Sequence, residues 1–193
     1  MPLRVQPQSS EVAVAACEVP HAVVRRATVR DLDAVMQLRL ALLREYPDHP
    51  IYGRLQPDVS ARARTLFDAQ LRSPSDSIFL ASFARARGRG AAAESVGILR
   101  CTESTNSPLL MPLRYAYVSS VYVRPDARRR GVLRALLAAA EQWARARGLE
   151  EMRLHNVADS VSAEGAWSAL GFAVVEHVRW RRMTPEPGLD ATT

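Results

Sequence analysis

One segment in the middle of the chain changes from a strand pattern to a helix pattern with almost no spacer. Residues 115–123 are rich in β-branched and aromatic side chains, and a helical spacing of apolar residues begins at Val132. The turn between them carries four arginines and one glycine: Arg124, Arg128, Arg129, Arg130 and Gly131. The first N–H groups of a helix have no intrahelical acceptor, and the helix dipole adds positive charge there. The sequence therefore predicts an anion-binding turn that suits a phosphate or pyrophosphate group.

The length and composition of the chain fit one domain with a sizeable core. The chain has 193 residues, of which 48% are hydrophobic and 24% charged, with a net charge of +6. We expect a single domain over residues 21–183, a flexible extension over residues 1–20 and a tail over residues 184–193. All 26 basic residues are arginine, which we attribute to genomic composition. The arginines are spread along the chain, and no aromatic platform accompanies them, so nucleic-acid binding is not expected.

Cysteine content and hydropathy point to a cytoplasmic protein. Cys17 and Cys101 are the two cysteines, too few for a disulfide framework, which favours a reducing compartment. No apolar run approaches the ~18 residues of a membrane span. We expect neither a membrane partner nor a metal.

The order of strand and helix patterns predicts a mixed α/β sheet with helices on both faces. Strands are expected at residues 22–26, 78–84, 96–101, 115–123, 151–157 and 172–182, with a hairpin tip at residues 85–93 and a polar loop at residues 102–112. Thr28 and Asp31 form a capping-box pattern before a helix that should end ahead of Pro47. Further helices are expected at residues 57–71, 132–147 and 160–170.

The turn resembles the signature of the GNAT superfamily of acyl-CoA-dependent N-acetyltransferases. That signature is Arg or Gln, two residues, Gly, one residue, and Gly or Ala; here it is Arg128-x-x-Gly131-x-Leu133. Leu133 departs from the small residue expected last. The departure tightens the space beside the pyrophosphate but leaves the backbone donors in place.

A second stretch of the sequence is also similar to the GNAT superfamily. Its matching landmarks are Leu154, Ala163, Gly171 and Phe172, while Ser160 replaces an Asn and Trp167 a Tyr. The resemblance covers about residues 22–182. It implies a GNAT-like fold whose mostly antiparallel sheet splays between the fourth and fifth strands.

The resemblance implies a coenzyme A site around the basic turn. The pyrophosphate would lie on the amides of residues 129–134, and the pantetheine arm would pair with the backbone of Val121 and Val123. A backbone N–H near Val121 would stabilise the oxyanion. The expected cofactor-binding residues are Val121, Tyr122, Val123, Arg128, Arg129, Arg130, Gly131, Val132, Leu133, Arg134 and Ser160.

The candidate catalytic residues are Ser119, Asn156 and Trp167. Ser119 stands where some family members have a glutamate base, so it would hold a water, or it is an ordinary strand serine. Indole is too weak an acid to protonate a thiolate, so Trp167 is expected to pack against the pantetheine or the core. Asn156 would orient substrate or water, or would be a buried residue satisfied by backbone. No Cys or Ser lies in a clear nucleophile setting, which favours direct attack.

Acceptor recognition is expected from the loops at residues 46–56 and 102–112. Glu45, Asp48 and Glu103 would attract a cationic amine or are ordinary solvated charges. Tyr117 is expected on the strand face of Ser119 and Val121, where it would touch the acceptor or pack. His155 is expected on the face opposite Asn156, in a surface role.

The resemblance implies an acetyl-CoA-dependent N-acetyltransferase that acts on a primary amine of a small molecule or protein. It also implies a homodimer formed through residues 174–180. One alternative is a GNAT-fold module that binds acyl-CoA with little turnover, because the usual Glu and Tyr are absent. The other is an arginine-rich RNA-binding domain, which would bind with a steep salt dependence.

Overall fold

The computed structural model describes residues 21–83, 94–157 and 160–183 of the chain. The chain divides into two compact units, of which the first ends at His155 and the second begins at Asn156. The expected extension, hairpin tip and tail lie outside the described residues, and so does Cys17.

Among the described helices, none combines the length and apolar character needed to cross a membrane.

The first unit is built on a five-stranded mixed sheet whose strands lie side by side in chain order. The strands are β1 (Ala22–Arg26), β2 (Asp76–Phe83), β3 (Ser95–Thr105), β4 (Arg114–Val123) and β5 (Met152–Leu154). β1 to β4 are antiparallel to their neighbours, whereas β5 is parallel to β4. The expectation of a mixed, mostly antiparallel sheet is confirmed.

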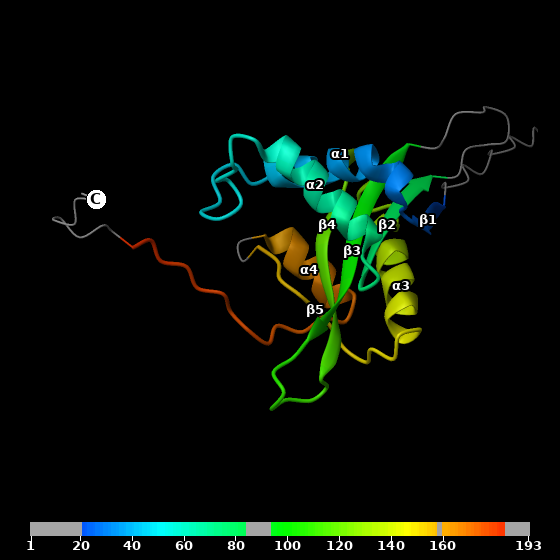
Figure 1. Cartoon of the computed structure of the whole chain (residues 1–193), viewed down its shortest axis with the longest axis vertical. Coiled ribbons are helices and arrows are strands. Elements are labelled where there is room, and N and C mark those ends of the chain that lie inside the picture. Colours follow the sequence, from blue (N-terminus) through cyan, green and yellow to red (C-terminus); the bar gives the residue numbers. More distant parts are fainter. Residues whose placement is uncertain (1–20, 84–93, 158–159, 184–193) are drawn as a thin grey trace, which may run out of the picture. The chain divides into compact units, whose positions relative to one another are not determined.

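Helices cover both faces of this sheet, as expected (Figure 1). α1 (Leu32–Arg44) and α2 (Val59–Arg72) pack on one face around Val35, Phe67 and Ile98. α3 (Val132–Arg145) packs on the other face. Short 3-10 turns, η1 (Val29–Asp31) and η2 (Pro125–Ala127), precede α1 and the basic turn. The basic turn is therefore held by a helix whose apolar side is in the core.

The predicted capping box begins η1, the 3-10 turn that leads directly into α1. The Asp31 carboxylate accepts from the backbone N–H of Thr28 at 2.8 Å and from its hydroxyl at 3.0 Å. Arg25 donates to the same carboxylate at 2.6 Å, and this pairing holds the pKa of Asp31 well below its ordinary value. α1 ends at Arg44, before Pro47 as expected.

β4 contains a β-bulge that the sequence pattern did not predict. Arg100 lies opposite Ser119 and Ile98 opposite Tyr122, so two residues of β4 face one of β3. Ser120, in the bulge, has a φ of 56°. An extra residue reverses which side chains face each helix layer.

The strand prediction was wrong at three places. β3 continues to Thr105, into the predicted loop, because it pairs with β4 as far as Arg114. β5 spans three residues rather than residues 151–157. Residues 172–183 form no strand in the described part of the chain, and their large apolar side chains, such as Val175 and Trp180, are exposed. A strand requires a backbone partner, which patterning cannot supply.

The second unit contains the predicted last helix, α4 (Val161–Ala169). The Ser160 hydroxyl accepts from the N–H of Ala163 at 3.4 Å and caps the helix. Trp167 contacts Phe172 edge-on, with ring centroids 5.4 Å apart.

Candidate active site

The basic turn presents a row of backbone donors. None of the amides of residues 129–134 donates to an acceptor among the described residues. Gly131 is the N-cap of α3 with a φ of 77°, and it provides no side chain to cap the helix. Arg129 is also left-handed, with a φ of 58°. These unsatisfied donors at a helix N-terminus form a site for an anion.

The arginines around the turn have different surroundings. Arg128 donates to the carbonyl of Val123 at 3.0 Å and pairs with Glu45 on the chain after α1. The guanidinium of Arg130 lies over the ring of Phe83, 3.8 Å from its centroid. Arg128 therefore holds the turn in place, while the exposed Arg129 and Arg134, which make no ion pair with a described residue, leave positive charge beside the amides.

Two expected cofactor residues are anchors whose side chains point into the protein. Val132 is 1% exposed within the core beneath α3. Tyr122 is 7% exposed in the core beneath α1 and α2. Both can offer only backbone groups to a ligand. Leu133 is half-buried, and its amide belongs to the unsatisfied row.

The end of β4 provides a second set of backbone groups. β5 pairs with residues 116–118 alone, so residues 119–123 have no strand partner on that edge in the described part of the chain. The bulge at Ser120 lies in this stretch, followed by Val121 and Val123. An extended ligand can pair with such an edge as an added strand.

The bulge corrects the expected face of Val121. Val121 and Val123 pack against the core beneath α3. Ser119 lies opposite Arg100, on the face covered by α1 and α2. Tyr117 shares the face of Ser119 but not that of Val121, because the extra residue lies between them.

Ser119 is held by an arginine in the sheet. Its hydroxyl accepts from a guanidinium N–H of Arg100 at 3.2 Å. Arg100 also forms a salt bridge of 2.5 Å with Asp76, whose side chain is 9% exposed. Ser119 keeps its own O–H free to donate, which suits it to hold a water.

Tyr117 and His155 form a pair that sequence reasoning missed. The Tyr117 hydroxyl lies 2.9 Å from Nδ1 of His155, and the rings meet edge-on. Burial, chiefly, raises the pKa of Tyr117 above its ordinary value, which keeps the phenol protonated. His155 is exposed, so its expected surface position is confirmed, although it contacts Tyr117, a residue expected to touch the acceptor or pack. The two residues are 38 positions apart in the sequence, so no local pattern indicates their contact.

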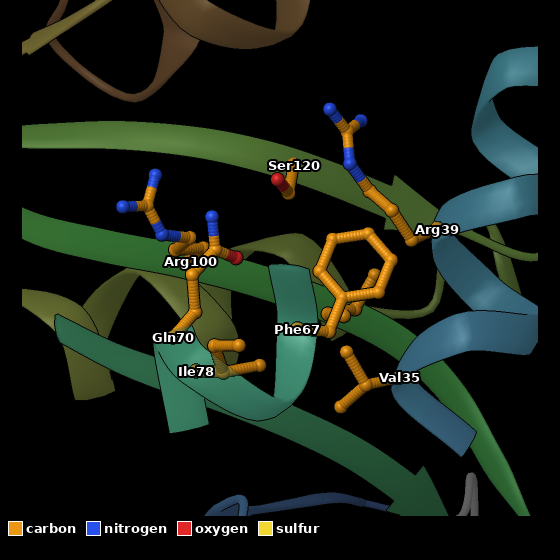
Figure 2. A pocket seen from close by; sticks show the side chains of 8 residues that line it. Val35, Arg39, Phe67, Gln70, Ile78, Arg100 and Ser120 are labelled. Atoms are coloured by element: carbon orange, nitrogen blue, oxygen red, sulfur yellow. The ribbon is translucent and has the colours of Figure 1, made fainter. Parts of the chain in front are cut away.

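A shallow pocket, with no enclosed space the size of a water molecule, lies beside the bulge on the face of α1 and α2. Its lining residues are Val35, Arg39, Phe67, Gln70, Ile78, Ile98, Arg100 and Ser120 (Figure 2). Arg39 is half-buried and makes no hydrogen bond or ion pair with a described residue. Burial lowers the pKa of Arg39, Tyr52 raises it, and Arg100 lowers it further. Its position four residues after the buried Val35, on the apolar face of α1, is a signal that the sequence did contain.

The acidic residues expected near the acceptor are mostly neutralised. Glu45 pairs with Arg128. Glu103 pairs with Arg114 at 2.6 Å and with Arg147 at 3.3 Å. Asp48 remains exposed in the loop after α1.

The loop at residues 46–56 contributes aromatic rings. His49 stacks on Tyr52 with centroids 4.6 Å apart, and Tyr46 meets both rings. Nδ1 of His49 accepts from the N–H groups of Ile51 and Tyr52, which fixes the ring. The loop therefore carries rigid polar rings rather than an acidic cluster.

Three expected site residues belong to the second unit. Asn156 is exposed and donates to the carbonyl of Val157 at 3.3 Å, so the alternative of a buried amide was wrong, while its role in orienting substrate or water stays a prediction. The amide lies past the end of β5, where no strand covers it. Trp167 packs on Phe172, and the Ser160 hydroxyl caps α4.

Cys101 has no nucleophilic character. The side chain is 0% exposed in the core beneath α3. Burial raises the pKa of Cys101 to about 12. The thiol therefore stays protonated, in agreement with the expected packing role.

Comparisons with known proteins identify the family of the chain. Residues 39–172 match the family described as Acetyltransferase (GNAT) family. An aminoglycoside N(6')-acetyltransferase type 1 of Stenotrophomonas maltophilia is 30% identical over 164 residues, which cover 85% of this chain and 94% of that protein.

Solved structures share the fold. Aminoglycoside N-acetyltransferase AAC(6')-Iy in complex with CoA superimposes with a TM-score of 0.66 at 20% identity, covering 85% of this chain and 95% of that one. A predicted acetyltransferase with acetyl-CoA from Clostridium acetobutylicum gives a TM-score of 0.64 at 14% identity, covering 85% and 96%. The chain belongs to the GNAT acetyltransferase family and is an acetyl-CoA-dependent N-acetyltransferase.

Proposed function

We propose that the protein transfers an acetyl group from acetyl-CoA directly to a primary amine of a small molecule, at the bulge of β4. The observation that carries this proposal is the row of unsatisfied amides at residues 129–134, next in the chain to the unpartnered edge of β4.

The proposed donor site begins at the basic turn. The pyrophosphate of acetyl-CoA accepts from the amides of residues 129–134, and Arg129 and Arg134 add charge. The pantetheine arm pairs with the edge of β4 at Val121 and Val123. The thioester then lies beside the bulge, where the N–H near Val121 stabilises the oxyanion without reorganising.

The proposed proton route uses the pair that joins β4 and β5. An ammonium group must lose a proton before its nitrogen can attack the thioester carbon. The Tyr117 hydroxyl takes this proton as it passes its own to Nδ1 of His155, which is 2.9 Å away. The proton leaves through exposed His155 to solvent. The CoA thiolate departs without a protein acid, since a thiol pKa near 8.5 makes it a tolerable leaving group. The second proton, which the amine nitrogen loses as the tetrahedral intermediate collapses, reaches this thiolate through solvent.

Direct attack is supported by the state of the candidate nucleophiles. Cys101 is buried and protonated. The Ser119 hydroxyl is hydrogen-bonded to a cation, Arg100, which does not deprotonate it. An acetylated enzyme intermediate therefore has no suitable residue among these.

The relative from Stenotrophomonas maltophilia makes an aminoglycoside the second candidate acceptor, at the 6'-amine that its name gives. The observation in favour is 30% identity over 94% of that protein. The positive charge of the pocket lined by Arg39 and Arg100 argues for a different class of acceptor.

The test is to incubate the protein with acetyl-CoA and a panel of primary amines, and to follow free thiol and acetylated product by mass spectrometry. Amine-dependent thiol release with stoichiometric N-acetylation supports the proposal. Tight CoA binding with no release under any amine would instead identify a module that only binds acyl-CoA.

A further inference from the structure

We propose that Arg39 and Arg100 bind a carboxylate of the acceptor, so that the substrate is an amine that also carries a carboxylate group. This inference rests on the proposed function, because it assigns the substrate class of that same site.

Arg39 is a partly buried cation that the described residues do not neutralise. The side chain lies half-buried on the core face of α1 and has no anionic partner among the described residues. Removing a charge from water without a partner costs folding free energy. Arginine stays protonated under all such conditions. A cation that the fold itself does not neutralise is thus available to an anionic ligand.

The guanidinium of Arg100 is only partly satisfied by the protein. One side of its guanidinium is held by Asp76 at 2.5 Å, and another N–H reaches Ser119 at 3.2 Å. Its buried Nε has no hydrogen-bond partner among the described residues. Figure 2 shows the side chains of Arg39 and Arg100 on either side of Ser120. Asp76 is the single acid paired there in the part of the chain that the structure describes, so the pocket keeps an excess of positive charge.

The surrounding charges disfavour a polycationic acceptor. Of the three acids that could have attracted ammonium groups, Glu45 and Glu103 are each paired with arginine, and Asp48 alone remains exposed without a described cationic partner. An aminoglycoside carries several ammonium groups, and like charges repel in a partly desolvated pocket. A planar carboxylate, in contrast, accepts two parallel N–H bonds from a guanidinium.

The pocket also lies where a substrate amine would react. Ser120 belongs to both the pocket lining and the bulge of β4. Arg100 donates to Ser119, and Tyr117 lies two residues before Ser119 on the same face of β4, which places the Tyr117–His155 pair in the same neighbourhood.

The experiment compares acceptors that differ in one group. The probes are lysine and cadaverine, which differ by the carboxylate, together with phosphoethanolamine and an aminoglycoside. We expect kcat/KM to be at least about tenfold higher for lysine than for cadaverine, as one charged hydrogen-bonded contact allows. Arg39→Gln should abolish this preference, mainly through KM, and Arg39→Lys should restore part of it.

Arg44→Gln is the matched control, because it removes the same charge from the exposed end of the same helix. The control should keep the preference for lysine. Arg39→Gln should also leave the Tm unchanged or raise it, since it removes a desolvated charge. A large fall in Tm would mean that Arg39 is structural and would overturn the proposal.

Binding without turnover separates this inference from the proposed function. Calorimetry on the CoA-loaded protein with N-acetyl-lysine should give heat in the wild type and none in Arg39→Gln. No heat in the wild type, a preference for phosphoethanolamine or the aminoglycoside, or a preference that survives Arg39→Gln overturns the inference. Absence of N-acetylation of every amine, with CoA and N-acetyl-lysine still bound, overturns the proposed function alone.

Discussion

The hydroxyl oxygen of Tyr117 and Nδ1 of His155 lie 2.9 Å apart, across the short parallel pairing of β4 with β5. The register sets Tyr117 opposite Arg153, and His155 is the residue that directly follows β5. β5 ends at Leu154, so the Tyr117–His155 pair lies where the edge of β4 loses its strand partner. The two rings are therefore fixed at the place where the acetyl group is proposed to react.

Removing this pair should slow the chemical step. We expect Tyr117→Phe and His155→Ala each to lower kcat by about a hundredfold, the range of general acid–base catalysis, with little change in CoA affinity. Steady-state kinetics at saturating acetyl-CoA measure the first, and calorimetry the second. Tyr115→Phe is the control, since Tyr115 instead stacks with Arg153 at 4.1 Å.

The same pair sets the expected pH dependence. His155 accepts the proton only when its ring is neutral, so kcat should fall as the solution is made more acidic, and this acidic limb should depend on His155. The pKa of Tyr117 is raised, so no loss of activity from its ionisation is expected below about pH 10. If His155→Ala retains the acidic limb of the kcat profile, the proton route lies elsewhere.

Gly131→Ala should weaken CoA binding. A φ of 77° is strained for any side chain, so the turn would relax and misalign the amides of residues 129–134. Gly148→Ala is a matched control, because Gly148 has a φ of 68° at the far end of α3, and neither position has a protein atom within 4 Å of an added Cβ. Both variants should lose about 1 kcal/mol of stability, but only Gly131→Ala should raise the Kd for CoA. An equal Kd in both variants would remove the turn from the CoA site.

Cys101→Ala should leave kcat unchanged. The thiol is fully buried, and its raised pKa of about 12 keeps it unreactive. In a Cys17→Ser background, Ellman's reagent should label Cys101 only after denaturation. Rapid labelling of the native protein, or loss of turnover in a folded Cys101→Ala variant, would argue for a covalent role.

Asp31 should make the fold less stable in acid. Its pKa is lowered in the folded state, chiefly by Arg25, so the stability it contributes is present above the unfolded value near 3.9 and is lost as the pH falls toward the folded value. Asp31→Asn should therefore cost about 1 kcal/mol at pH 7 and progressively less below about pH 4. Urea denaturation at several pH values measures this. A cost independent of pH would mean that the ion pair with Arg25 contributes nothing.

Much of the fold could be predicted because its signals are local. The capping box at Thr28 and Asp31, the apolar spacing of α3 and the αL glycine after it depend on residues a few positions apart. The signal of the basic turn is also local. Its backbone N–H groups are unsatisfied because the N-cap of α3 is Gly131, which has no side chain to cap the helix. The strand expected at residues 172–182 failed for the opposite reason: its pattern is local, but a strand exists only with a partner.

The sequence by itself determined the anion-binding turn and the helices and strands that hold it, since backbone donors at a helix start need no distant residue. Only the tertiary structure decided the acceptor side. The bulge at Ser120, the contact of Tyr117 with His155 and the pocket shared by Arg39 and Arg100 all depend on how distant segments pair and pack. The bulge reverses which face of the sheet the side chains after Ser119 occupy. The residue pattern of β4 alone does not indicate this bulge, because it depends on how β4 pairs with β3.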